Sequence, residues 1–155
     1  MKVIYLASPY TNRSFATKDW RACRAAEISI EIWKQLGIVA YSPIAAWHPW
    51  LSTLNLEAEY PAWAIQDKEI VRRSDELWVL MLEGWETSGG IKDEMNFARS
   101  EGKPVKYVLY NYNKPANFKV LDESPVNTPH EPLQDILACT GGECSLRKNT
   151  TFDVR

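Results

Sequence analysis

The sequence alternates short apolar runs with segments whose apolar residues recur at helical spacing, and no other feature limits the fold as strongly. Short apolar runs bounded by turn residues predict strands, while apolar residues three or four positions apart predict helices. Strands that alternate with helices predict an α/β fold, an open parallel sheet with flanking helices in a flavodoxin-like or Rossmann-like three-layer sandwich. The predicted strands are residues 2–7, 38–42, 76–82 and 104–110, and the predicted helices are residues 18–36, 59–73 and 90–101.

Turn chemistry sets several boundaries of these elements. Gly37 and Gly102 stand where a glycine would end a helix. Residues 46–55 have the Trp, His and Pro content of an irregular loop. We therefore expect a loop, and no helix, after the second strand.

The chain of 155 residues has the length of one domain. Residues 1–110 carry the whole alternation of strands and helices, and we expect them to form the α/β domain. Residues 111–155 contain many Asn and Pro residues. They predict a C-terminal extension that packs on the domain or on a partner subunit, with one short helix at residues 133–138.

Charge and composition argue against several classes of function. The formal net charge is -2 and the basic residues are scattered, so no nucleic-acid polymer is expected as a partner. No apolar run could span a membrane, and the first residues, MKVIYLASPY, lack the apolar region of a signal peptide. We expect a cytoplasmic protein. The fingerprints Gly-x-x-x-x-Gly-Lys-Ser/Thr and Gly-x-Gly-x-x-Gly and the cysteine spacing of a four-ligand zinc site are missing, so neither a cofactor nor a metal is expected.

The loops after the first three strands are expected to share a ligand site, because ligands bind beyond the carboxyl ends of parallel strands. The third loop ends in Ser88, Gly89 and Gly90, directly before a predicted helix. Unpaired backbone N–H groups and the positive end of the helix dipole would suit a phosphate there. The alternative is a pair of glycines that only makes the turn. The three loops are residues 8–13, 44–54 and 83–90.

Two carboxylates near this site are candidates for chemistry. Glu94 falls near the first turn of the third predicted helix, where the dipole favours a carboxylate that stays ionised and ready to act as a nucleophile or base. The alternative is a glutamate that faces water, since Asp93 would satisfy the dipole equally well. Asp67 lies on the second predicted helix, and its alternative is the solvated face of an amphipathic helix.

Several segments, taken together, resemble the nucleoside 2-deoxyribosyltransferase-like superfamily. SPIAAWHP and GKPV are similar to segments of a bacterial and phage branch of that superfamily. The resemblance covers about residues 2–109. The other segments that carry it are YLASPYTNR at the end of the first strand, Asp67 eight residues before Asp75, the SDELWVL strand, and the pattern Ser88-x-Gly90-x-x-x-Glu94.

The resemblance implies cleavage of the base-sugar bond of a nucleoside or nucleotide. The matching positions imply that Glu94 attacks C1′ of the sugar to form a glycosyl-enzyme ester, and that Asp67 assists the base as it leaves. An oxocarbenium-like transition state needs a carboxylate on one face and a proton donor toward the leaving group. Water then completes a hydrolysis, whereas a second base completes a transfer.

One position separates two branches of the superfamily. The deoxyribosyltransferases carry an aspartate six residues before the nucleophile, whereas this chain has Ser88, as the 2′-deoxynucleoside 5′-monophosphate N-hydrolases do. The resemblance implies that Ser88, Gly89 and Gly90 bind a 5′-phosphate, which an aspartate would repel. Arg13 matches an arginine of the hydrolases and would add positive charge, while Tyr10 replaces another of their arginines.

Four further residues are expected near the sugar or the base. Tyr5, Ser8 and Tyr10 stand at the end of the first strand, although Tyr5 has strand packing as an alternative. His48, in the loop after the second strand, could stack on a base or donate a proton, and its alternative is to cap backbone groups.

The tryptophans divide into two predicted groups. Trp33 and Trp78 fall on helix-face and strand positions and are predicted to lie in the core. The others could sandwich a base in the cleft or form a subunit interface. This second group is Trp47, Trp50, Trp63 and Trp85.

We therefore expect an N-glycosidase that acts, without a metal, on a deoxynucleoside 5′-monophosphate. Members of the superfamily commonly form homo-oligomers that complete each other's sites, so a homo-oligomer is expected. The alternatives are a deoxyribosyltransferase, a non-catalytic nucleotide-binding protein of the same fold, and an enzyme that cleaves a larger N-glycoside such as NAD.

Overall fold

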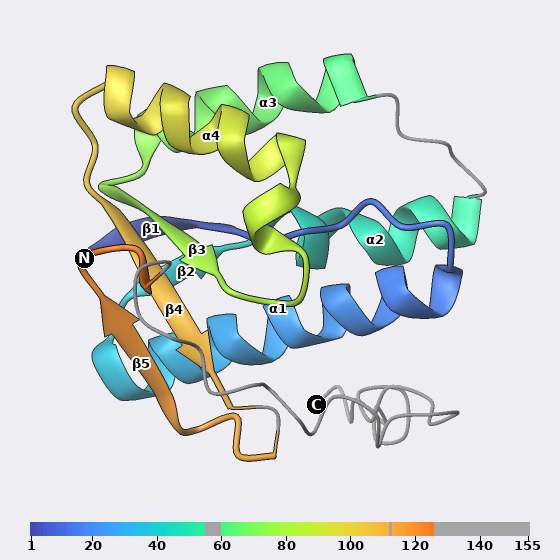
Figure 1. Ribbon diagram of the computed structural model, residues 1–155, viewed down its shortest axis with the longest axis horizontal. Helices are drawn as coiled ribbons and strands as arrows, with labels where there is room; N and C mark the ends of the chain where they lie inside the picture. The colour runs from blue at the N-terminus through green and yellow to red at the C-terminus, as the bar shows by residue number, and fades with distance from the viewer. Residues whose placement is uncertain (55–59, 112, 126–155) are drawn as a thin grey trace, which may run out of the picture.

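The computed structural model describes residues 1–54, 60–111 and 113–125. This part of the chain forms one five-stranded sheet with helices on both faces (Figure 1), and the predicted three-layer α/β fold is confirmed. The predicted helix at residues 133–138 and most of the predicted extension lie outside the described residues. The strands are β1 (Val3–Ala7), β2 (Val39–Tyr41), β3 (Glu76–Leu80), β4 (Val105–Tyr110) and β5 (Phe118–Leu121). The helices are α1 (Phe15–Leu36), α2 (Pro43–Leu54), α3 (Tyr60–Arg73) and α4 (Gly89–Ser100), with a short 3-10 turn at Trp85–Thr87.

The strands follow the order β2-β1-β3-β4-β5, which is the flavodoxin-like order. β1 lies inside the sheet, with Tyr5 opposite Tyr41 of β2 and Leu77 of β3, and both pairings are parallel. β5 is antiparallel to β4, with Val120 opposite Val108. The sheet is therefore mixed rather than wholly parallel, because four residues of the predicted extension add an antiparallel edge strand.

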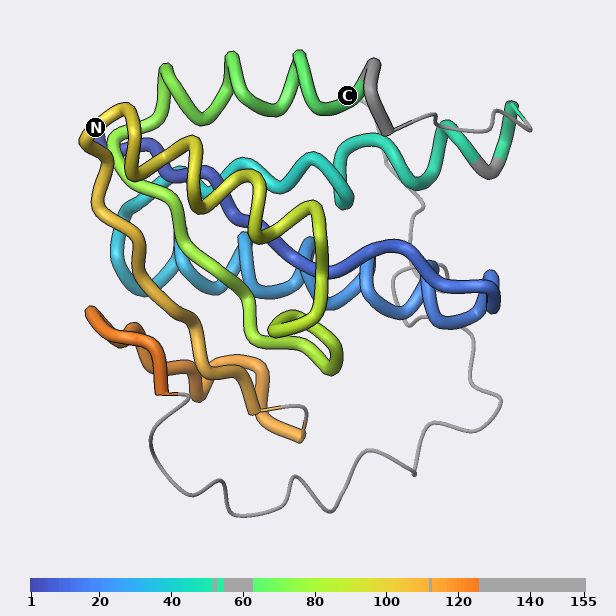
Figure 2. The backbone as a smooth tube through the Cα atoms, turned by 45° about the horizontal axis from the view of Figure 1, so that its top comes forward, coloured from blue at the N-terminus to red at the C-terminus, as the bar shows by residue number. Residues whose placement is uncertain are grey.

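The side chains of β1 alternate between the two helix layers, as the pleat of a strand requires. Leu6 packs in a cluster with Ile28 of α1, whereas Tyr5 packs in a second cluster with Val71 of α3 and Ile91 of α4. Figure 2 shows α3 and α4 side by side on one face of the sheet and α1 on the other. The loop after β1 therefore starts from the centre of the sheet, within reach of both layers.

α1 begins at Phe15, earlier than the predicted start at Lys18. Ser14 caps it, because its Oγ accepts a hydrogen bond from the backbone N–H of Thr17 at 3.4 Å. The earlier start places Lys18 at the end of the first turn and Arg21 three residues later on the same face. Neither α1 nor any other described helix is both long and apolar enough to cross a membrane.

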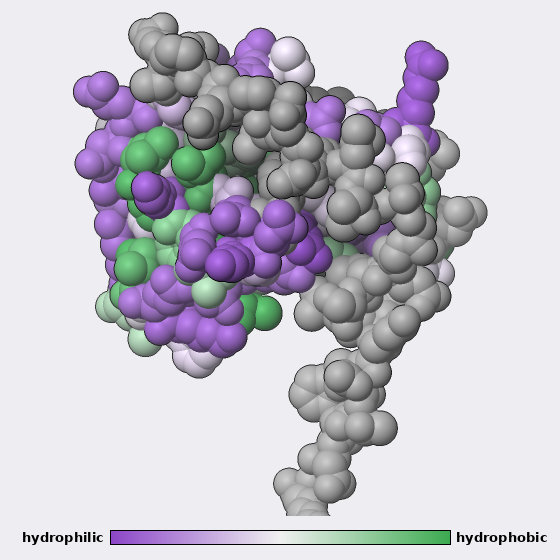
Figure 3. All heavy atoms as spheres, turned by 60° about the horizontal axis from the view of Figure 1, so that its bottom comes forward, coloured by the Kyte–Doolittle hydropathy of each residue, from purple (hydrophilic) through white to green (hydrophobic). Residues whose placement is uncertain are grey.

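The C-terminal half of α1 carries exposed hydrophobic side chains. Trp33 is 59% exposed, so its predicted place in the core is wrong, whereas Trp78 on β3 is buried as predicted. Ile28 and Ile32 are buried, and one further residue turns Trp33 about 100° around the helix. Figure 3 views this side of the molecule and shows hydrophobic side chains beside hydrophilic ones. The expected homo-oligomer stays a prediction.

The irregular loop predicted at residues 46–55 is wrong, because residues Pro43–Leu54 form α2. Ser42 precedes the helix, and its Oγ accepts a hydrogen bond from the backbone N–H of Ala45 at 3.3 Å. Proline suits the first helical position, where its missing N–H would have no partner in any case. Pro49 lies inside the helix without ending it. The Ser42-Pro43 pair is therefore the sequence signal of α2.

Candidate active site

A cleft of about 680 Å³ lies at the carboxyl ends of β1, β2 and β3. Ligand pockets commonly have volumes of about 300–1,000 Å³. All three predicted loops contribute to the lining of the cleft, so the prediction that they meet is confirmed. Tyr5 and Arg13 are not among the residues that line it. The predicted site residues that do are Ser8, Tyr10, His48, Asp67, Ser88, Gly89, Gly90 and Glu94.

Two carboxylates enter the cleft from neighbouring helices of one layer. Asp67 comes from α3 and Glu94 from α4, and both line the cleft. Asp67 lies close enough to Glu94 for its charge to raise the pKa of Glu94. The structure thus brings together two acidic side chains that are 27 positions apart in the sequence.

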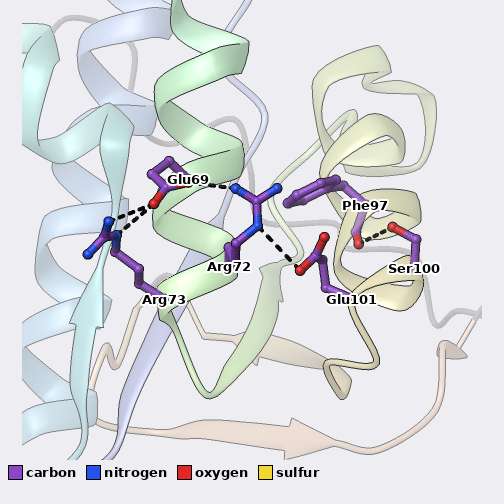
Figure 4. A network of polar contacts seen from close by, with 6 residues as sticks. All are labelled: Glu69, Arg72, Arg73, Phe97, Ser100 and Glu101. Atoms are coloured by element: carbon purple, nitrogen blue, oxygen red, sulfur yellow. Dashed lines mark hydrogen bonds and ion pairs between the residues drawn. The ribbon is translucent and has the colours of Figure 1, made fainter.

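Contacts on the outer surface hold these two helices together. Lys68 forms an ion pair with Asp93 at 2.9 Å, and these residues directly adjoin the two cleft carboxylates in the sequence. Arg72 pairs with Glu101 at 3.4 Å and its guanidinium lies 5.2 Å from the ring centre of Phe97, as Figure 4 shows. Lys68 lies 5.8 Å from the same ring. Exposed ion pairs contribute little stability singly, so their main effect here is to fix how α3 faces α4.

Burial makes Glu94 hard to ionise. It raises the pKa of Glu94 to about 8, a hydrogen bond from Tyr5 opposes this rise, and the charges of Asp67 and Asp93 add to it. The Tyr5 hydroxyl donates to Oε1 of Glu94 at 2.7 Å. The prediction that Glu94 stays ionised near the start of a helix is therefore wrong. α4 begins at Gly89, so Glu94 sits in its second turn, where the dipole has faded.

Asp67 is also desolvated, and part of it has no partner. Burial raises the pKa of Asp67 to about 6. Its Oδ1 is buried without a hydrogen-bond partner, and so is Oγ of Ser8. Buried polar atoms are nearly always paired in folded proteins. Because both residues line the cleft, these atoms are placed to bind a ligand.

The two carboxyls differ in how strongly they hold a proton. With pKa values of about 6 for Asp67 and about 8 for Glu94, the pair carries one proton between these two pH values. The cleft therefore offers one acid and one base at neutral pH. In the described part of the chain, no three His, Cys, Asp or Glu side chains gather as a metal site would require.

The start of α4 forms a second chemical region of the cleft. Ser88 caps the helix, with its Oγ accepting from the backbone N–H of Ile91 at 3.4 Å, and its own O–H remains as a donor. The first N–H groups of a helix, here those of Gly89 and Gly90, have no partner within it. A Cβ added to Gly89 would meet no atom within 4 Å, so a ligand can approach this backbone closely.

Two cations of α1 line the cleft, and the sequence analysis missed both. They are Lys18 and Arg21. The Arg21 guanidinium donates to the backbone carbonyls of Thr11 at 3.1 Å and Glu83 at 2.9 Å, which ties the loop after β1 to the loop after β3. Arg13, the predicted cation, is exposed. The Ser14 cap is the signal that would have placed Lys18 and Arg21 on the first turns of the helix.

An aromatic wall closes one side of the cleft. Trp47 of α2 and Trp63 of α3 line it, with ring centres 5.2 Å apart and planes tilted by 57°. Trp85 is instead buried against Tyr107, at 5.6 Å, and Trp50 is 59% exposed and does not line the cleft. Two of the four tryptophans predicted around the cleft therefore lie there.

Comparison with protein families gives a match over most of the chain. A family model described as a domain of unknown function (DUF1937) matches residues 2–111. No curated protein matches the chain. The matched residues hold every described element except β5 and every residue that lines the cleft.

We predict that Glu94→Gln stabilises the protein at alkaline pH. The folded state keeps the Glu94 proton up to about pH 8, whereas an unfolded chain releases it near the ordinary value of 4.5, so stability falls as the pH rises between these values. Glutamine removes this loss and still accepts from Tyr5. Thermal unfolding should show a higher Tm for the variant at about pH 8.5 and little difference at about pH 5. Glu83→Gln, at an exposed glutamate, is the control. If Glu94→Gln and the unmodified protein had the same Tm at both pH values, the raised pKa of Glu94 would be contradicted.

Proposed function

This chain belongs to the DUF1937 family, and we propose that it is an N-glycosidase that cleaves the base-sugar bond of a deoxynucleoside 5′-monophosphate. The observation that carries the proposal is that Asp67 and Glu94 line one ligand-sized cleft, in which burial raises the pKa of both carboxyls. Glycosidic cleavage needs one carboxylate and one proton donor. The resemblance to the nucleoside 2-deoxyribosyltransferase-like superfamily supports the same roles.

In the first step, the Glu94 carboxylate attacks C1′ of the sugar as the bond from C1′ to the base nitrogen breaks. The electron pair of that bond goes to the base, which receives a proton from Asp67, and a glycosyl ester remains on Glu94. The empty cleft holds the shared proton on Glu94, the group of higher pKa. Positive charge that develops on the sugar favours the ionised form of the nearest carboxylate, and the Tyr5 bond stabilises that form, so the proton shifts toward Asp67.

In the second step, water attacks C1′ of the ester and gives its proton to the Asp67 carboxylate. The bond to Glu94 breaks, and the sugar phosphate leaves with a new hydroxyl at C1′. The pair has then regained its single proton. A second base in place of water would give a deoxyribosyltransferase.

The substrate class follows from the groups around the carboxyl pair. The Ser88 hydroxyl and the first N–H groups of α4 suit an anion, and Lys18 adds a positive charge from the opposite layer. Glu94 lies six positions after Ser88 along α4, a rise of about 9 Å that the sugar of a nucleotide can bridge. Trp47 and Trp63 offer aromatic faces to the base. A nucleoside 5′-monophosphate meets all three regions.

We predict that the purified protein releases free base from a deoxynucleoside monophosphate. The test is incubation with deoxy- and ribonucleoside monophosphates, the matching nucleosides and NAD, with and without an acceptor base, followed by chromatography of the products. Asp67→Asn should lower the rate by roughly 10²–10⁴, the range for a general acid, and Glu94→Gln should abolish it. Glu83→Gln is the matched control.

Other outcomes of this assay separate the alternatives. A new nucleoside formed only with the acceptor base would make the protein a transferase. Binding of nucleotides without any turnover would mean that the fold serves recognition and that the catalytic roles of Glu94 and Asp67 are wrong.

We predict a bell-shaped dependence of kcat/KM on pH, with limbs at about pH 6 and about pH 8. Below the lower value both carboxyls are protonated and no nucleophile remains. Above the upper value both are ionised and no acid remains. In Asp67→Asn only one carboxyl titrates, so one limb should disappear. A rate that stays constant across this range would rule out the shared-proton mechanism.

We predict that Lys18, and not Arg13, binds the phosphate. Lys18→Met keeps the apolar stem and removes the charge, which should raise KM for a monophosphate about tenfold, the low end for a bond to a charged group. KM for the matching nucleoside should not change. Arg13→Gln is the control because its side chain lies outside the cleft. A larger effect of Arg13→Gln on the monophosphate would reverse the assignment.

A further inference from the structure

Three polar side chains from three segments form a hydrogen-bonded chain that ends in the cleft. His48 of α2 lies at its centre, with Nδ1 2.8 Å from the Tyr10 hydroxyl and Nε2 3.2 Å from Oδ1 of Asp19 on α1. His48 is only 4% exposed, and the ring of Phe15 lies 5.5 Å from its own. Tyr10 and His48 both line the cleft. The imidazole is therefore held in one orientation with both nitrogens engaged.

The partners of His48 fix the direction of each bond in this chain. A carboxylate only accepts hydrogen bonds, so Nε2 carries the ring proton and donates a hydrogen bond to Oδ1 of Asp19. With the ring neutral, Nδ1 is then an acceptor, and the Tyr10 O–H donates to it. Burial raises the pKa of Tyr10, so the hydroxyl keeps its proton. The oxygen of Tyr10 has only lone pairs left for any other partner.

We propose that Asp19 and His48 turn the Tyr10 hydroxyl into a fixed hydrogen-bond acceptor, which selects ligands that present an N–H or O–H donor to this wall of the cleft. The inference rests on the proposed function, and it adds the chemical class of the group that Tyr10 recognises. In a nucleotide this donor is an exocyclic amine or a ring N–H of the base, or a hydroxyl of the sugar. A carbonyl oxygen of the ligand in the same place would face the lone pairs of the Tyr10 oxygen, with no proton to form a hydrogen bond.

Tyr10 is the residue that contacts the ligand, and Asp19 and His48 are positioning residues. Their chain also ties α1 and α2 to the loop after β1, which is a structural role on its own. If Asp19 and His48 had a structural role alone, replacing them would change the affinity for all nucleotides by the same factor. The ratio of affinities for two ligands that differ in one donor group therefore distinguishes selection from support.

The experiment measures binding by calorimetry to the full chain carrying Glu94→Gln, so that no ligand is consumed and the result does not depend on turnover. Three matched pairs locate the donor. Deoxyadenosine against deoxyinosine monophosphate and deoxycytidine against deoxyuridine monophosphate exchange an amine for a carbonyl on the base. Adenosine against deoxyadenosine monophosphate tests the sugar hydroxyl.

We expect the two members of at least one pair, which present their donors at different positions, to differ about tenfold in affinity. Tyr10→Phe should bring that ratio close to one. Asp19→Asn should lower it, because an amide can donate to Nε2, move the ring proton to Nδ1 and free the Tyr10 proton for the ligand. Asp19→Glu should retain the preference. Tyr107→Phe, at a buried tyrosine outside the cleft, should leave the ratio unchanged.

Two kinds of result would overturn the inference. One leaves the proposed function standing, and the other contradicts it as well. If nucleotides bind but no pair differs, or the ratio survives Tyr10→Phe, the selection by Tyr10 is wrong while the proposed function stands. If no nucleotide binds and none is turned over by the unmodified chain, the proposed function fails and the inference falls with it.

Discussion

β1 lies between β2 and β3, and this parallel pairing determines where the loops of the cleft begin. The same strand sends Leu6 to the α1 layer and Tyr5 to the layer of α3 and α4. Tyr5 therefore joins the hydrophobic core to the candidate active site, because its ring packs among buried residues and its hydroxyl donates a hydrogen bond to Glu94. The cleft also divides its charges by layer: the cations come from α1, whereas the carboxyls come from α3 and α4.

The parallel part of the fold could be predicted because buried parallel strands are near-continuous apolar runs, as in ELWVLML. α2 was open to prediction from Ser42 and Pro43, but the aromatic and proline content of the next residues favoured a loop. β5 carries a weaker signal, since four residues between turns are too short for a periodic pattern. The position of Trp33 depended on which face of α1 meets the sheet, and one residue of rotation was enough to expose it.

The candidate site was predictable in its residue types more than in its electrostatics. The resemblance pointed to Glu94 and Asp67, and the structure places both in one cleft. Their protonation depends on burial by segments far apart in the chain, which a linear pattern does not contain. Arg13 was predicted from the resemblance, whereas the cations that line the cleft, Lys18 and Arg21, come from the first turns of α1, which begins three residues before its predicted start.

Arg21 joins two cleft loops through the backbone carbonyls of Thr11 and Glu83, and not through their side chains. Any residue at these two positions supplies the same carbonyl. Gly84 is different, because its φ is 87° and an added Cβ would lie 3.3 Å from Nη2 of Arg21. The loops can thus diversify at most positions while Arg21 and Gly84 preserve their spacing. Such an arrangement would let the side chains that contact a ligand change without a change in the spacing of the two loops.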